Sequence, residues 1–99
     1  MVKNVLVWTR RSQLHLKALF KYINEDSPQN AILVVNDIVE AIEKATVNPE
    51  YYNPDKYKID NDGSYRAFEK HRYRLVYRYQ KNTIRVLRIK HTSMEPKRY

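Results

Sequence analysis

The segment Tyr73–Tyr79 alternates between two kinds of side chain, and this pattern constrains the fold more than any other stretch. Its odd-numbered positions hold Tyr, Leu, Tyr and Tyr, whereas its even-numbered positions hold Arg, Val and Arg. Successive side chains of a β-strand point to opposite faces, so a period of two predicts a strand with an apolar face and a basic face. After residues 80–82, the run Thr83–His91 is predicted to be the partner strand of a hairpin, with Leu87 and Ile89 as apolar positions.

Positive charge is concentrated in the same region of the chain. From Tyr65 to His91 there are nine basic residues and a single acidic one, Glu69. The nine are Arg66, Lys70, Arg72, Arg74, Arg78, Lys81, Arg85, Arg88 and Lys90. Like charges directly opposite each other on neighbouring strands destabilise a sheet, so folding alone does not require them. The sequence therefore predicts a twisted sheet whose basic face binds an anionic partner.

The distribution of charge over the whole chain indicates the kind of partner. The chain has 99 residues, enough for one domain with one core, and a net charge of +8. Residues 1–49 carry six basic and five acidic side chains, whereas residues 50–99 carry thirteen and six. This asymmetry points to nucleic acid or an acidic protein. A membrane surface fits less well, because the basic half is sheet-like and not an amphipathic helix.

Several chemistries are excluded or disfavoured by composition. The chain has no Cys, so it forms no disulfide and performs no thiolate chemistry, which fits a reducing compartment. No apolar run is long enough to span a bilayer and no signal sequence opens the chain, so we expect a cytoplasmic protein. A single Gly cannot build a phosphate-cradling loop, and no metal-ligand spacing appears, so we expect neither a metal nor a cofactor.

The first half of the chain has the pattern of a strand followed by two helices. Residues 4–8 form a short apolar run, and Thr9 or Ser12 is positioned to cap a helix. Ser27 and Pro28 suit the N-cap and first position of a second helix. The predicted apolar stripes are Leu16, Leu19, Phe20 and Ile23 in the first helix, and Ala31, Val35, Ile38, Ile42 and Ala45 in the second. The short link between them predicts an antiparallel helical hairpin.

Residues 47–64 form a long connection, with a turn at residues 61–63 and a short strand expected near Tyr57–Ile59. The whole order predicts an α+β fold in which the N-terminal helical hairpin packs on one face of a small twisted, largely antiparallel sheet. Trp8 and the odd-numbered tyrosines of residues 73–79 are expected in the core. The side chains expected to be exposed are His15 on the first helix and, as base-stacking candidates, Tyr51, Tyr52 and Tyr57. His71 has no evident partner.

Several local strings resemble the RelE/ParE superfamily of bacterial toxins from type II toxin–antitoxin modules. These strings are residues 26–28 (Asp-Ser-Pro), 65–66 (Tyr-Arg), 73–77 (Tyr-Arg-Leu-Val-Tyr), 86–91 (Val-Leu-Arg-Ile-Lys-His) and the ending 91–99. The resemblance covers essentially the whole chain, residues 1–99, as a single toxin domain. It implies the fold described above and neutralisation by a cognate antitoxin whose segment wraps the toxin surface.

The resemblance also implies two alternative targets. RelE-like members cut messenger RNA in the ribosomal A site without a metal, whereas ParE-like members inhibit DNA gyrase and lack the nuclease residues. Metal-free cleavage needs a base, an acid and cations that stabilise the phosphate. Carried over residue by residue, the resemblance assigns phosphate stabilisation to Arg74, proton transfer to His91 and a place near the reacting nucleotide to Tyr99.

Further basic residues are predicted to contact nucleic acid or the antitoxin. They are Lys56, Lys58, Arg66, Arg78, Arg88 and Lys90. Two departures from the nuclease pattern stand out. Lys56 and Lys58 lie several residues too far from Arg74 to match the RelE lysines, so the base is unassigned. Met94 occupies a position where related sequences commonly carry Arg, and Met cannot stabilise a phosphate.

Three functional hypotheses follow from these residues. The preferred one is a ribosome-dependent mRNA endoribonuclease (mRNA interferase) that arrests translation and is neutralised by an acidic antitoxin. The alternatives are a ParE-like toxin that inhibits gyrase without cleaving RNA, and a basic binding module without catalytic activity. His91 and Tyr99 favour the first, whereas Met94 and the displaced lysines favour the others.

Overall fold

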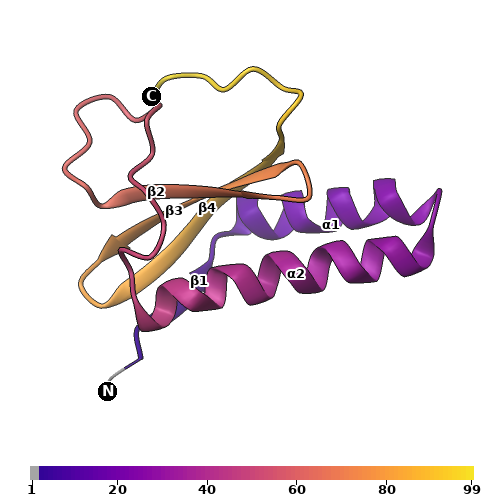
Figure 1. Ribbon diagram of the computed structural model, residues 1–99, viewed down its shortest axis with the longest axis horizontal. Helices are drawn as coiled ribbons and strands as arrows, with labels where there is room; N and C mark the ends of the chain where they lie inside the picture. The colour runs from indigo at the N-terminus through magenta and orange to yellow at the C-terminus, as the bar shows by residue number, and fades with distance from the viewer. Residues whose placement is uncertain (1–2) are drawn as a thin grey trace.

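The computed structural model describes residues 3–99 and contains two helices packed on one side of a four-stranded sheet. The elements are β1 (Val5–Trp8), α1 (Arg10–Asn24), α2 (Pro28–Val47), β2 (Tyr65–Lys70), β3 (Tyr73–Gln80) and β4 (Thr83–His91). In Figure 1, α2 runs below the sheet, α1 extends to its right, and the last segment of the chain arches above it. The predicted order of strand, two helices, connection and strands is confirmed.

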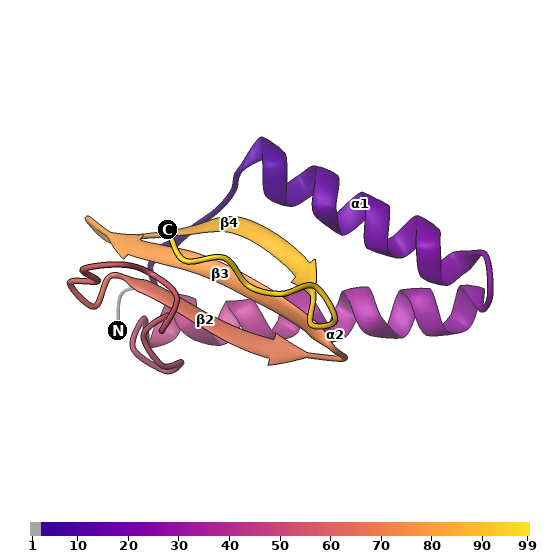
Figure 2. The ribbon, with the colours of Figure 1, turned by 90° about the horizontal axis from the view of Figure 1, so that it is seen from above.

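Side-chain caps fix where the two helices begin. The hydroxyl of Thr9 accepts a hydrogen bond from the backbone N–H of Ser12 at 3.2 Å, and Ser27 does the same for Asn30 at 3.2 Å. Pro28 follows Ser27 at the first helical position, where its missing N–H costs nothing. Both starts agree with the sequence, with Thr9 as the cap of α1. The two helices run antiparallel as the predicted hairpin (Figure 2).

The sheet has the strand order β1-β4-β3-β2 and is mixed. β2 pairs antiparallel with β3, and β3 with β4, whereas β1 pairs parallel with β4. The sheet is therefore largely antiparallel, as expected, with one parallel pair. A parallel pair needs a crossover connection, and the helical hairpin provides the first part of it. This pairing places the N-terminal strand, β1, beside the last strand, β4.

A β-bulge in β4 corrects the simple alternation predicted for this strand. Tyr77 lies opposite Val86 but Val76 lies opposite Arg88, so Leu87 is an extra residue. Strict alternation would have placed Leu87 beside Ile89 on the apolar face, and this prediction is wrong. Because one extra residue changes which side chains face inward, both halves of β4 contribute to the core. Its buried residues are Ile84, Val86 and Ile89.

The core lies between the helices and the odd-numbered residues of β3. Leu75 and Tyr77 are buried, and Tyr73, Tyr79 and Trp8 are partly buried against the same cluster, as predicted. The Tyr77 hydroxyl donates to the carbonyl of Pro49 at 2.8 Å, so its burial leaves no polar group unpaired. The predicted helix stripes need one correction. Phe20 is 36% exposed because it lies at the margin of the helix interface.

The connection between α2 and β2 is ordered by hydrogen bonds rather than by a strand of its own. The strand expected near Tyr57–Ile59 is absent, because these residues pair with the end of the chain instead. The turn predicted at residues 61–63 is confirmed, since the side chain of Asn61 accepts from the backbone N–H of Gly63 at 2.9 Å. Gly63 has φ +94°, a conformation that L-residues with a side chain rarely adopt.

One residue of the connection and one of α1 differ from their expected environments. Tyr52 is not an exposed stacking candidate, because its ring stacks on Phe68 and its hydroxyl donates to the carbonyl of Ala41 at 2.6 Å. His15 is half-buried, not exposed, and its Nδ1 accepts from the backbone N–H of Ile89 at 3.0 Å. Within residues 3–99, no helix has the length and apolarity needed to cross a membrane.

Candidate functional site

The sheet face turned away from the helices carries most of the basic side chains predicted for it. Directly opposite residues on neighbouring strands share a face. Arg74 lies opposite Lys90, Arg78 opposite Arg85, and Val76 opposite Arg88, with the bulge between the last two pairs. The five cations Arg74, Arg78, Arg85, Arg88 and Lys90 therefore share one face, which we call the basic face. The predicted division of the hairpin into an apolar side and a basic side is confirmed.

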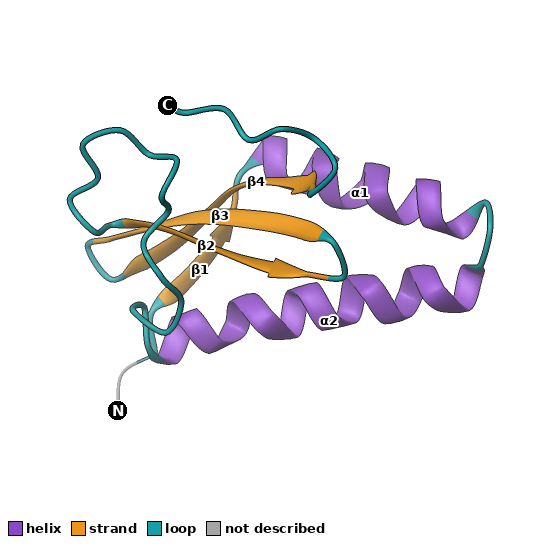
Figure 3. Ribbon diagram, turned by 45° about the horizontal axis from the view of Figure 1, so that its top comes forward, coloured by secondary structure: helices purple, strands orange, loops and turns teal. Residues whose placement is uncertain are grey.

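The C-terminal segment, residues 92–99, crosses above the basic face (Figure 2). Its end is attached to the connection by two backbone hydrogen bonds. Tyr99 N–H donates to the carbonyl of Tyr57 at 3.1 Å, and Ile59 N–H donates to the carbonyl of Tyr99 at 2.6 Å. Figure 3 shows the connection and the C-terminal segment on the same side of the sheet. Between the segment and strands β3 and β4 lies a cavity of about 600 Å³.

Asp55 lies at the centre of the contacts beneath this segment. It is 2% exposed, and both of its carboxylate oxygens are hydrogen-bonded. Oδ1 accepts from the Arg74 guanidinium at 2.7 Å and from the Tyr57 N–H at 3.1 Å, while Oδ2 accepts from the Tyr99 hydroxyl at 2.6 Å. Burial alone would raise the pKa of Asp55, but the hydrogen bonds from Tyr99, Arg74 and Tyr57 outweigh it and lower the pKa below 3.8. Asp55 is therefore ionised at neutral pH.

Tyr99 is held by both its ring and its hydroxyl. The Arg88 guanidinium lies 4.1 Å from the ring centroid, and Tyr65 contacts the ring edge-to-face with centroids 5.9 Å apart. Burial, together with the hydrogen bond and the negative charge of Asp55, raises the pKa of the phenol well above its usual value of 10.0. At neutral pH the hydroxyl keeps its proton and donates a hydrogen bond to Asp55.

Arg74 has two carboxylate partners and one aromatic neighbour. Besides Asp55, its guanidinium contacts Glu69 at 3.3 Å and lies 4.9 Å from the ring centroid of Tyr57. The side chain of Asp55 is 1% exposed, so this ion pair is buried on the acidic side. The cation that the resemblance assigns to phosphate stabilisation is therefore neutralised by a carboxylate of the same chain.

Arg78 and Arg88 differ from Arg74 because neither has a carboxylate partner among the described residues. Arg78 donates to the Ser64 hydroxyl at 3.2 Å and lies over the ring of Tyr65 at 4.6 Å. Stacking on an aromatic ring orients a guanidinium without cancelling its charge. Together with Arg85 and Lys90, which are exposed, these side chains make the basic face attractive to an anion.

His91 lies at the rim of the cavity, at the end of β4. Its Nδ1 accepts from the backbone N–H of Ser93 at 3.0 Å and lies 2.7 Å from the Ser93 hydroxyl oxygen. The ring also contacts Tyr73 edge-to-face, with centroids 5.1 Å apart. Because Nδ1 is occupied as an acceptor, Nε2 is the ring nitrogen left to exchange a proton with a ligand.

The other three basic residues predicted to bind nucleic acid or the antitoxin, Lys56, Lys58 and Arg66, do not all lie on the same side of the sheet. Lys58 lies near the basic face, 4.9 Å from the ring centroid of Tyr65, and Lys56 lies 5.3 Å from that of Tyr57. Arg66 does not join them, because it lies opposite Tyr77 on the helix side of the sheet. Its guanidinium is bound to two backbone carbonyls, those of Tyr52 at 2.8 Å and Gly63 at 2.9 Å. The structure thus brings Lys58, Arg78, Arg88 and Lys90 together, leaves Lys56 exposed beside Tyr57, and places Arg66 on the other side of the sheet.

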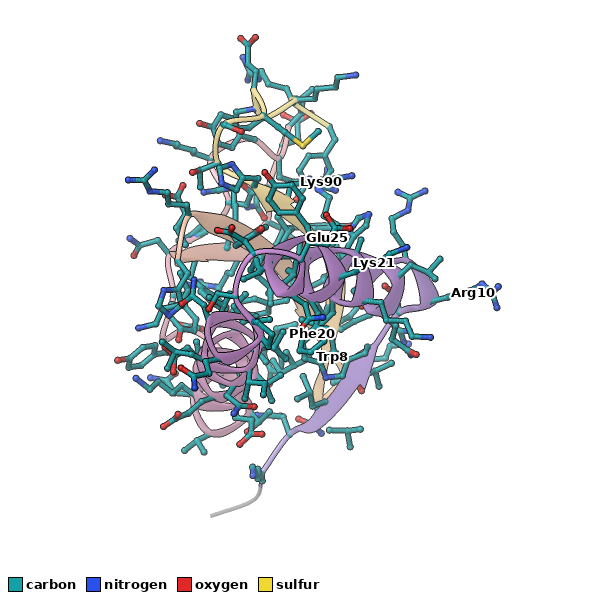
Figure 4. The ribbon with its side chains drawn as sticks, turned by 90° about the vertical axis from the view of Figure 1, so that its right-hand side faces the viewer. Trp8, Arg10, Phe20, Lys21, Glu25 and Lys90 are labelled. Carbon is teal, nitrogen blue, oxygen red and sulfur yellow. The ribbon has the colours of Figure 1, made fainter. Side chains whose placement is uncertain are left out.

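A second hollow lies on the opposite side of the molecule, between β1 and the helices. Its apolar lining includes Trp8, Leu16, Phe20 and Val35. Figure 4 shows Trp8 and Phe20 close together beneath α1, on the other side of this helix from Lys90. The residues described contain no group of His, Asp and Glu side chains placed to hold a metal ion.

The sequence of this chain matches the model of one known protein family. A family model described as the ParE toxin of the type II toxin–antitoxin system, parDE, matches residues 6–96. The chain belongs to the ParE toxin family. The match covers the sheet, both helices and most of the C-terminal segment, so the RelE/ParE resemblance found in the sequence is confirmed. No match was found among curated proteins.

Solved structures with the same fold include two toxin–antitoxin systems. A chain of the chromosomal ParDE system from P. aeruginosa matches with a TM-score of 0.70 and 24% identity, over 90% of this toxin and 96% of that chain. A chain of the RelBE2 toxin–antitoxin complex from Mycobacterium tuberculosis matches with a TM-score of 0.62 and 20% identity, over 92% and 93%. At these identities the likeness shows the fold, which both branches of the superfamily share.

The residue that sequence reasoning missed is Asp55. It follows Pro54 in a polar connection, where an acidic side chain is expected to be solvated, and no local pattern marks it as buried. Its two side-chain partners lie 19 and 44 residues further along the chain. Only the three-dimensional arrangement of the toxin reveals its role.

Proposed function

We propose that this ParE-family toxin arrests growth by binding its target, DNA gyrase, and not by cleaving RNA. The observation that carries the proposal is that Arg74 and Tyr99, two of the three side chains assigned to cleavage, are bound to the buried carboxylate of Asp55. Gyrase is the target of the ParE-like branch that the sequence resembles, and the family match favours that branch.

The chemistry of cleavage supports the same conclusion. A metal-free ribonuclease needs a base for the ribose hydroxyl, an acid for the leaving oxygen and a cation on the phosphate. Tyr99 keeps its proton at neutral pH, and Arg74 already neutralises Asp55. His91 offers one ring nitrogen, so a single group would have to perform several tasks. Binding requires only the exposed cations of the basic face.

We further propose that the toxin is neutralised by an acidic antitoxin. Arg78, Arg85 and Lys90 extend over β3 and β4 without an acidic partner in the described structure and would attract a negatively charged segment. The affinity of such a complex should fall as the salt concentration rises, since salt screens exposed charges. An affinity that stays constant from low to high salt would contradict the charge argument.

Induction of the toxin in cells tests the choice between the two branches. Plasmid supercoiling and the 5′ ends of ribosome-bound mRNA are measured in parallel, for the wild type and the variants R78Q/R88Q, H91Q and K21Q. We expect loss of supercoiling with intact mRNA in the wild type and H91Q, and a weaker effect in R78Q/R88Q. K21Q changes the charge of an exposed side chain on α1, away from the basic face, and serves as the control.

The ribonuclease hypothesis predicts a different result in the same experiment. A-site cuts in mRNA that disappear in H91Q and in R74A, with normal supercoiling, would refute the proposal. The observation that favours the ribonuclease hypothesis is that His91 lines the cavity beside Lys90, where it could transfer a proton.

A further inference from the structure

Asp55 connects its own loop to β2, to β3 and to the C-terminal segment. Its backbone N–H donates to the carbonyl of Tyr65 at the start of β2, at 2.8 Å, and its backbone carbonyl accepts from the Asn61 side chain at 3.2 Å. Its carboxylate binds Arg74 from β3 and Tyr99 from the C-terminal segment. Every polar atom of Asp55 is hydrogen-bonded, and its 2% exposure excludes solvent from these contacts.

These contacts have two consequences for the basic face. The first is electrostatic, because the negative charge of Asp55 lies 2.7 Å from the Arg74 guanidinium and cancels it for any ligand outside. The second is geometric, because the Tyr99 hydroxyl is fixed by Asp55, and the Tyr99 ring is in turn the surface on which Arg88 stacks at 4.1 Å. The charge and position of two of the five arginine and lysine side chains therefore depend on one carboxylate.

We propose that Asp55 is a positioning residue that sets the charge of the basic face: it withdraws Arg74 from ligand binding and, through Tyr99, orients Arg88 toward an anionic ligand. The ligand is contacted by Arg88 and its neighbours and not by Asp55 itself. The inference holds for any anionic partner and does not depend on gyrase being the target.

Elution from a heparin column tests the electrostatic part, because heparin is a sulfated polyanion that retains basic proteins according to their accessible charge. D55N keeps the size of the side chain but removes its charge, so Arg74 becomes available and the variant should elute at higher salt than the wild type. D26N makes the same charge change in the link between the helices and is the matched control, with a smaller expected shift. The double variant D55N/R74Q should return to the wild-type elution position.

Loss of an arginine from the face completes the comparison. R78Q should elute at lower salt than the wild type, because Arg78 is available to the ligand. R74Q leaves the charge of Asp55 without its cation and should also elute at lower salt, whereas D55N/R74Q, which removes both charges, should not. Circular dichroism establishes which variants are folded. If R74Q does not fold, the comparison of D55N with D55N/R74Q still decides the question. D55N eluting no later than D26N, or D55N/R74Q eluting as late as D55N, would overturn the proposal.

The geometric part has a spectroscopic readout that a merely structural role would not change in the same way. The toxin is labelled with 3-fluorotyrosine, and the Tyr99 signal is identified by its absence in Y99F. In folded D55N the phenol pKa of Tyr99 should fall relative to the wild type, because the negative charge of Asp55 no longer opposes ionisation of the phenol. An unchanged Tyr99 titration in folded D55N would show that Asp55 does not hold this ring.

Discussion

His15 provides a stability prediction that depends on pH. The parallel partner strand β1 covers β4 only as far as Val86. Beyond Val86, the Nδ1 of His15 accepts a hydrogen bond from the backbone N–H of Ile89 at 3.0 Å. The imidazole thus provides an acceptor for a backbone group of β4 that β1 does not reach. Protonation of Nδ1 would replace this acceptor with a donor. The hydrogen bond therefore requires a neutral imidazole whose proton is on Nε2.

The sign of the pH effect follows from the environment of the ring. Burial lowers the pKa of His15 below 6.5, and the positive charges of Lys90, Arg11 and Arg88 lower it further. The unfolded chain thus binds a proton at a higher pH than the folded toxin does. The contribution of His15 to stability is fully present above pH 6.5 and is lost as the pH falls through the lower folded pKa.

The variant H15L measures this contribution. Removing the acceptor leaves the Ile89 N–H without its partner, which costs about 1–2 kcal/mol at this half-buried site. For a domain of this size the melting temperature should fall by roughly 4–8 °C per kcal/mol. Urea unfolding of wild type and H15L at pH 7.5 and pH 5 gives the difference in unfolding free energy at each pH. We expect the difference to be present at pH 7.5 and to shrink at pH 5.

A control is needed because a second histidine, His71, has a carboxylate partner. His71 Nε2 lies 2.6 Å from a carboxylate oxygen of Asp37, a partner that the sequence did not reveal. Comparing H15L with the wild type in an H71Q background removes this second contribution. A difference that is the same at both pH values, or no loss of stability in H15L at pH 7.5, would refute the assigned role of His15.

Three further predictions concern the stability of the sheet. L75A should lower the unfolding free energy by about 3–4 kcal/mol in urea titrations, because the side chain is 1% exposed and leaves a cavity. R74A should cost about 3 kcal/mol by leaving Asp55 buried without its cation, whereas R78A should cost less than about 1 kcal/mol, and equal losses would contradict the difference in burial. R72G should raise the melting temperature, since Arg72 has φ 66° in the β2–β3 turn, a conformation that favours Gly.

Features set by local patterns could be predicted from the sequence. Ser27 and Pro28 mark the start of α2, because capping depends only on neighbouring backbone groups. The odd positions of β3 face the helices because a pleat alternates along one strand. The fold and the common basic face followed from these local rules combined with the concentration of charge in the second half of the chain.

Features set by pairing between distant segments could not be predicted in this way. The bulge at Leu87 is determined by the register between β3 and β4, and the sequence of β4 alone does not predict it. Arg66 points to the helix side because Tyr65 pairs with Arg78, which a count along β2 alone cannot reveal. The burial of Asp55 likewise depends on Tyr99, which lies at the other end of the basic half.

The most direct test of the central claim uses purified components. Purified toxin is added to DNA gyrase with relaxed plasmid, and separately to ribosomes programmed with mRNA, at the same toxin concentrations. If the basic face is a binding surface whose Arg74 is neutralised by Asp55, the toxin will inhibit supercoiling, R78Q/R88Q will inhibit it less, and the mRNA will remain intact. Cleaved mRNA together with fully active gyrase would contradict the account.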